Sequence, residues 1–158
     1  MTITVMVVED NKEEQKKAKE VFEKAGYRVI IACSYEEFQQ KALQFNSFKD
    51  ISSEGKKIYY GDPNFPENKK TGELVDCIVT DLTFPEHSSL DSEVGDFGFV
   101  VFIRATKLGI PCYICTNSEH HGLNGKRGLI EEMMRVTGVV RPYSYRKNWA
   151  SFVPMENH

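Results

Sequence analysis

The stretch Val75–His87, VDCIVTDLTFPEH, runs a short apolar segment directly into one carboxylate, Asp81, and then reaches Pro85. The residues from Val75 to Thr80 have the β-branched composition of a buried strand. A carboxylate is costly to bury unless it is paired, hydrogen-bonded or bound to a metal. An acid at the end of such a strand therefore indicates a place that solvent or a ligand reaches.

The same pattern of apolar strand and amphipathic helix continues on both sides of this stretch. Helix signals include Asn11 as a cap, the capping box of Ser34 and Glu37, and Gly26 as a stop. Strands are predicted at residues 3–8, 27–33, 75–80, 110–116 and 138–140. Helices are predicted from Lys12 to Ala25, after Ser34, from about Phe97 to Leu108, and around Leu129 to Met134.

Alternating strands and helices predict an α/β fold with a doubly wound, five-stranded parallel sheet and helices on both faces. Ligands bind outside the carboxyl ends of such strands. Conspicuous polar residues fall at those ends, namely Glu9, Asp10, Asp81, Thr116 and Arg141.

Carboxylates that converge at one sheet edge repel one another unless a proton or a hard cation neutralises them. Mg²⁺ suits such a site, because it prefers oxygen ligands and is readily completed by a phosphoryl oxygen. An aspartate beside the metal, here Asp81, is able to attack phosphorus as a nucleophile. The Thr116 hydroxyl and the Arg141 cation are then expected to hold the transferred oxygens.

The bulk numbers describe one ordinary domain. The chain has 158 residues, 41% hydrophobic and 27% charged, with a formal net charge of -3, so no general basic field favours nucleic acid.

No apolar run approaches the length that spans a bilayer, and the amino terminus turns acidic too early for a signal peptide, so we expect a cytoplasmic protein without membrane contact. Two loop-like segments, about 46–73 and 86–94, interrupt the pattern.

Taken in order, these segments resemble the receiver (phosphoacceptor, CheY-like) domain of two-component response regulators. The resemblance rests on VMVVEDN with its acid pair, DCIVTDLTFP with an aspartate and a proline four residues later, DFGF, IPCYICTN and VVRPYS. It implies a flavodoxin-like fold over nearly the whole chain. We therefore expect a single, divergent receiver-like domain over residues 1–158, with insertions at about 46–73 and 86–94 and no output domain.

Carried over residue by residue, the resemblance implies that Asp81 is the phosphorylation site. Glu9, Asp10, Asp81 and the main-chain carbonyl of Thr83 are the implied Mg²⁺ ligands. Thr116 is the implied hydroxyl at the phosphoryl group, and Arg141 stands where the family has lysine.

The function implied is phosphorelay signalling, with a histidine kinase or phosphotransfer protein upstream and a regulated protein partner downstream. Self-phosphorylation and dephosphorylation would be its only chemistry, so the protein is not expected to be an enzyme. The family often uses the face of its last helix for dimerisation, so a homodimer is among the partners that the resemblance implies.

Two alternatives stay open. The first is a pseudo-receiver, a protein-interaction module in which Arg141 and the long loops keep the site from being phosphorylated. The second is a Mg²⁺-dependent phosphohydrolase that uses the same acids. The second is less favoured, because Thr83 stands two residues after Asp81, where the aspartate-based phosphatase pattern has a second aspartate.

Overall fold

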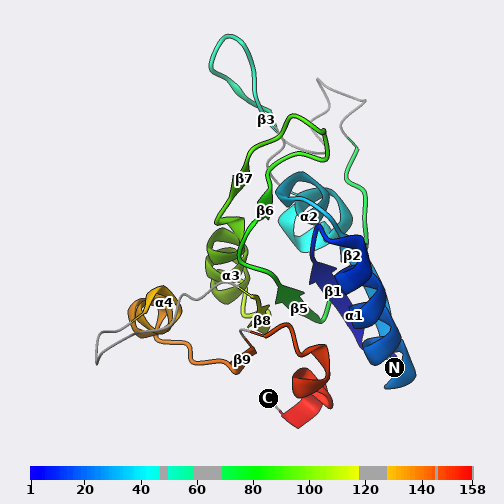
Figure 1. Ribbon diagram of the computed structural model, residues 1–158. Coiled ribbons are helices and arrows are strands. Elements are labelled where there is room, and N and C mark those ends of the chain that lie inside the picture. Colours follow the sequence, from blue (N-terminus) through cyan, green and yellow to red (C-terminus); the bar gives the residue numbers. More distant parts are fainter. Residues whose placement is uncertain (47–49, 59–68, 118–127, 145, 158) are drawn as a thin grey trace.

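The computed structural model describes residues 1–46, 50–58, 69–117, 128–144 and 146–157 (Figure 1). Its centre is a five-stranded sheet in the order β2-β1-β5-β8-β9, and every pair of neighbours in it is parallel. This order defines the flavodoxin-like type of doubly wound fold, so the predicted fold class is confirmed. The strands are β1 (Thr4–Val8), β2 (Arg28–Ala32), β5 (Cys77–Thr80), β8 (Cys112–Cys115) and β9 (Tyr143–Ser144).

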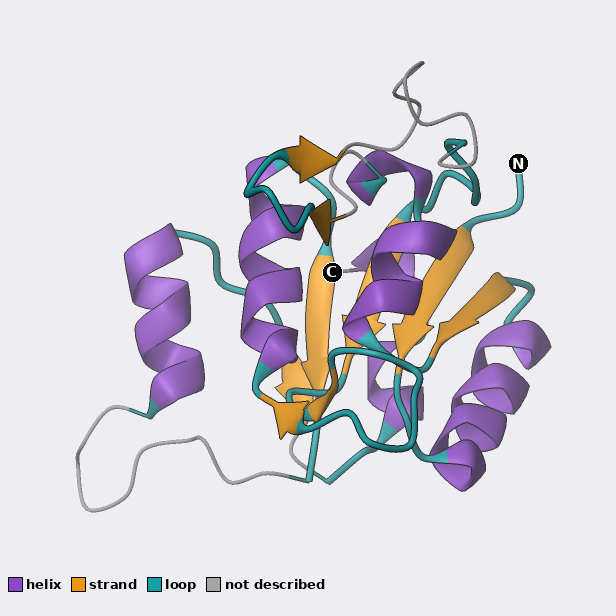
Figure 2. Cartoon of the chain, turned by 90° about the horizontal axis from the view of Figure 1, so that it is seen from above, coloured by secondary structure: helices purple, strands orange, loops and turns teal. Residues whose placement is uncertain are grey.

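Helices lie on both faces of this sheet, as Figure 2 shows. They begin at the predicted signals: the Asn11 side chain accepts a hydrogen bond from Glu14 N at 3.0 Å, and Ser34 Oγ accepts one from Glu37 N at 3.1 Å. The helices are α1 (Lys12–Lys24), α2 (Tyr35–Lys41), α3 (Phe97–Lys107) and α4 (Leu129–Thr137), with 3-10 turns η1 (Leu43–Phe45), η2 (Trp149–Phe152) and η3 (Met155–Asn157).

The central strand β1 is buried on both of its faces and divides the core into two halves. Met6 and Val8 join the cluster beneath α2, α3 and α4, whereas Val5 and Val7 join the cluster beneath α1 and the carboxyl-terminal segment. A strand that packs on both sides reads as a continuous apolar run, which is what the sequence shows at residues 3–8.

Two short antiparallel pairs belong to the predicted insertions. Strands β3 (Asp50–Ile51) and β4 (Lys57–Ile58) form a hairpin within the first insertion, and β6 (Phe84–Pro85) pairs with β7 (Val94–Gly95) at the two ends of the second. Residues 47–49 and 59–68 of the first insertion lie outside the described residues.

The predicted fifth strand at residues 138–140 is wrong. Helix α4 ends at Gly138, which has a left-handed backbone with φ of 71°, and the paired strand β9 begins only at Tyr143. Pro142 explains the delay, because proline has no N–H to donate to a neighbouring strand. Tyr143 and Ser144 pair with Ile114 and Cys115, so the end of this strand lies several residues later than the sequence predicts.

No helix in the described ranges has both the length and the apolar character needed to cross a bilayer.

Gly98 fits the first turn of α3 tightly against the loop that carries the acid. Its amide donates to Leu82 O at 2.9 Å, and a Cβ built on it would lie 2.5 Å from Leu82 Cα and closer still to the carbonyl oxygen of Asp81. Both neighbours are main-chain atoms, so no side-chain rotation relieves the overlap.

We therefore predict that Gly98→Ala lowers the free energy of unfolding by about 3 kcal/mol, because the new methyl group forces the backbone of Asp81 and Leu82 to move. Val100→Ala, on the partly exposed side of the same helix, should cost less than about 1 kcal/mol. Urea denaturation of both variants measures the difference. Equal and small losses would show that α3 does not press on this loop.

Candidate functional site

Three acids meet at the carboxyl edge of the sheet. Glu9 and Asp10 follow β1, Asp81 follows the neighbouring strand β5, and one carboxylate oxygen from each lies within 4.8 Å of the others. Glu9 is fully buried, Asp81 is 6% exposed, and Asp10 is exposed. The structure thus brings together the three carboxylates that the sequence predicted as metal ligands, and carboxylate oxygens suit a hard cation such as Mg²⁺.

Each carboxylate oxygen of the two buried acids has a partner. Glu9 Oε1 accepts from Asn11 N at 3.0 Å, and Asp81 Oδ1 accepts from Leu82 N at 2.7 Å. The remaining oxygens both face the Lys147 ammonium, which is 2.7 Å from Glu9 Oε2 and 3.0 Å from Asp81 Oδ2. The lysine side chain is only 10% exposed, so this ion pair is largely screened from water.

Lys147 is the cation that lies beside Glu9 and Asp81, and the sequence prediction did not include it. The prediction put Arg141 beside Asp81, but Arg141 precedes Pro142 and the delayed strand β9, whereas Lys147 follows that strand at its carboxyl end. The Arg141 charge acts instead on Cys112, at the amino end of β8, where burial raises the pKa of the thiol and Arg141 opposes the rise. No residue near Lys147 marks it in the sequence, because its place beside the acids depends on where β9 pairs with β8.

Burial is the largest single influence on the pKa of Glu9 and on that of Lys147, but it decides the direction only for Glu9. It raises the pKa of Glu9 to about 7, with the Asp81 charge acting in the same direction and the Lys147 hydrogen bond acting against it. Burial by itself lowers the pKa of Lys147, but the hydrogen bond to Glu9 and the charge of Asp81 outweigh it, so the net change is upward. The ammonium therefore stays charged at neutral pH.

The two predicted threonines lie on neighbouring segments. Thr116 follows β8 and is fully buried, and its amide donates to Ser144 O at 2.7 Å, which ties it to β9. Thr83 lies two residues beyond Asp81, and its hydroxyl donates to Asp96 Oδ1, just before α3, at 3.4 Å. The Thr83 carbonyl thus belongs to the same loop as the acid.

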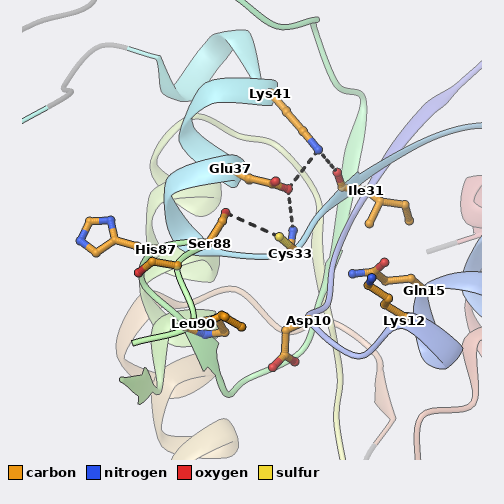
Figure 3. Close-up of a pocket in the computed structure, with 12 residues that line it drawn as sticks. Asp10, Lys12, Gln15, Ile31, Cys33, Glu37, Lys41, His87, Ser88 and Leu90 are labelled. Carbon is orange, nitrogen blue, oxygen red and sulfur yellow. Dashed lines mark hydrogen bonds and ion pairs between the residues drawn. The ribbon is translucent and has the colours of Figure 1, made fainter. Parts of the chain in front are cut away.

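A pocket of about 570 Å³ opens beside Asp10 (Figure 3). The second insertion forms one wall of this pocket through Ser88 and its neighbours. Two hydrogen bonds fasten the insertion at the start of α2: Ser88 Oγ lies 2.9 Å from Ser34 Oγ, and Glu36 N donates to Glu86 O at 2.8 Å. Figure 3 shows Lys41, Glu37, Cys33 and Ser88 joined in one network on the α2 side, with Asp10 and Lys12 on the α1 side.

No protein-family model and no curated protein sequence matches the chain. Among solved structures it is similar to the chemotaxis response regulator CheY4 of Vibrio cholerae, with 15% identity over 92% of this chain and 91% of that one and a TM-score of 0.47. It is also similar to a response regulator protein from Burkholderia multivorans, with 14% identity over 99% and 94% of the chains and a TM-score of 0.48.

The strand order β2-β1-β5-β8-β9 and the acids at the ends of β1 and β5 fit a divergent receiver domain, the family that the motifs resemble.

The raised pKa of Glu9 predicts how folding stability changes with pH. The carboxyl has a pKa of 4.5 ordinarily and about 7 in the folded protein, so the folded state holds this proton more tightly. The Glu9 contribution to stability is therefore fully present below pH 4.5 and is lost as the pH rises through about 7.

We expect Glu9→Gln to remove this part of the pH dependence, so that the decrease in unfolding free energy between pH 5 and pH 8 is smaller than in the unmodified protein. Glu13→Gln, an exposed acid of α1, should keep the full decrease. Urea denaturation in a chelating buffer at the two pH values measures both. An unchanged decrease in Glu9→Gln would mean that Glu9 titrates as an ordinary carboxyl.

Proposed function

We propose that this protein is a phosphorelay receiver in which Asp81 accepts a phosphoryl group. The observation that carries the proposal is the meeting of Glu9, Asp10 and Asp81 with the Lys147 ammonium at the carboxyl edge of a parallel sheet. Transfer of a phosphoryl group to a carboxylate needs this combination of a nucleophile, oxygen ligands for a cation and a fixed positive charge.

The donor set suits Mg²⁺, because three carboxylates each bring an oxygen within 4.8 Å of the others and Asp10 is exposed to solvent. We assign the metal to Glu9, Asp10, Asp81 and the Thr83 carbonyl. When bound, the ion supplies positive charge that offsets the phosphoryl oxygens.

In the proposed reaction an Asp81 carboxylate oxygen attacks the phosphorus of a phosphohistidine on a kinase or phosphotransfer protein. The new O–P bond forms as the N–P bond breaks, and the imidazole nitrogen leaves with the electron pair of that bond. The Lys147 ammonium and the Thr116 hydroxyl are assigned to the transferred oxygens. Hydrolysis of the acyl phosphate by water releases inorganic phosphate and restores the Asp81 carboxylate.

Phosphorylation would be transmitted to a partner through a change of charge at the site. Phosphorylation converts one carboxylate into a group with more negative charge and more acceptor oxygens, which draws Lys147 and Thr116 toward it and alters how a downstream protein binds. We propose that residues 1–158 act as one receiver unit in the cytoplasm, with the segments at about 46–73 and 86–94 as insertions.

A pseudo-receiver is the second candidate, and one observation favours it. All four carboxylate oxygens of Glu9 and Asp81 already face an N–H donor or the Lys147 ammonium. A pair satisfied in this way is able to serve as a structural ion pair in an interaction module that is never phosphorylated.

Incubation with acetyl phosphate and Mg²⁺ separates the two candidates. We expect intact-mass spectrometry to detect the addition of one phosphoryl group, and we expect Asp81→Asn to abolish it. Beryllofluoride with Mg²⁺ should shift amide signals of the loops after β5 and β8 in nuclear magnetic resonance spectra. Absence of both responses supports the pseudo-receiver.

Matched variants of the two candidate cations test the assignment of Lys147. Lys147→Met should slow phosphorylation by acetyl phosphate on the order of 100-fold, because the charge on the transferred oxygens loses its fixed partner. Arg141→Met should leave the rate unchanged. The reverse order of effects would restore Arg141 to the site and refute the assignment of Lys147.

A further inference from the structure

The carboxyl-terminal segment reaches the acid site from the α1 side of the sheet. Two residues after Lys147, Trp149 begins η2 and is 3% exposed, and its indole Nε1 donates to Glu14 Oε2 at 2.9 Å. Glu14 lies in the first turn of α1, only five positions beyond Glu9. The same helix start therefore holds both the acid and the segment that carries the lysine.

Lys147 does not adopt its position through backbone preference. Its φ of 46° lies in the left-handed region, which residues other than glycine, asparagine and aspartate rarely occupy. Such a conformation persists where the surrounding structure holds it in place. The Asn148 main-chain N–H donates to Ser144 Oγ at 3.1 Å across the turn that contains Lys147, and the Trp149 indole that follows is fixed to Glu14.

A divalent cation held by the acid cluster and the Lys147 ammonium would draw on the same two carboxylates, Glu9 and Asp81. The ammonium contacts Glu9 Oε2 and Asp81 Oδ2, and both acids also supply oxygens to the three-carboxylate cluster. Two positive charges at one pair of carboxylates repel each other strongly in a buried site. Binding of the ion to both acids therefore requires the ammonium to move. The free-energy cost of this movement depends on how firmly Lys147 is held.

We propose that Glu14 and Trp149 are positioning residues whose hydrogen bond holds Lys147 between Glu9 and Asp81 and thereby sets the affinity of the site for a divalent cation. The inference rests on the proposed function, and it adds a regulatory contact outside the reacting groups. Anything that loosens the contact between η2 and α1 makes the acids more available to the ion.

Mg²⁺ affinity, measured by calorimetry on the full chain, tests the proposal. Glu14→Met removes the acceptor at nearly constant length and should tighten Mg²⁺ binding roughly threefold or more. Trp149→Phe keeps an aromatic ring but removes the N–H, and should change the affinity in the same direction. Glu13→Met removes the same charge from the neighbouring position and should leave the affinity within about twofold.

A double-mutant cycle with Lys147→Met distinguishes positioning from a general effect on folding. Lys147→Met alone should tighten Mg²⁺ binding more than Glu14→Met does, because the competing ammonium is absent. In that background Glu14→Met should have no further effect, since nothing remains to be positioned. Equal effects of Glu14→Met with and without Lys147 would overturn the proposal.

Mg²⁺ binding that is unaffected by Glu14→Met and Trp149→Phe contradicts the positioning role and leaves the proposed function standing. No Mg²⁺ binding in any variant, including Lys147→Met, contradicts the cation site and with it the proposed function.

Discussion

The ion pair of Lys147 with Glu9 and Asp81 is the contact on which the rest of the site depends. Two carboxylates that lie side by side, one fully buried and one nearly so, repel each other unless a positive charge stands between them. Loss of one partner from a buried pair costs about 3–5 kcal/mol in proteins generally, because the remaining charge is left without compensation. The contact also joins the ends of β1, β5 and β9, three segments far apart in the sequence.

The sheet makes this contact possible because its strands are parallel and adjacent. Strand β1 lies between β2 and β5, so the residues after β1 and β5 emerge side by side at one edge. Tight packing of α3 against the loop after β5, through Gly98, holds the backbone of Asp81 in place. Apolar packing on both faces of β1 makes the sheet rigid. This rigidity keeps the negatively charged side chains at the carboxyl edge close together.

The insertions and the carboxyl-terminal segment shape the surroundings of the acids in different ways. The second insertion packs on α2 and encloses a pocket next to Asp10, the one exposed acid of the three. The carboxyl-terminal segment packs on α1 and delivers Lys147. The exposed acid therefore faces a cavity, whereas the two buried acids face their counter-ion.

The sequence by itself determined the helices, four of the five strands of the parallel sheet and the three acids. Apolar periodicity marks strands and helices locally, and the carboxyl ends of parallel strands necessarily share one edge, so Glu9, Asp10 and Asp81 could be grouped without coordinates. Only the tertiary structure decided which cation neutralises them. That choice depends on the pairing register of β9 after Pro142 and on the left-handed backbone of Lys147, both imposed by distant contacts with β8 and α1. The raised pKa of Glu9 was likewise decided only by the tertiary structure, because burial is a property of the assembled core and not of any local sequence pattern.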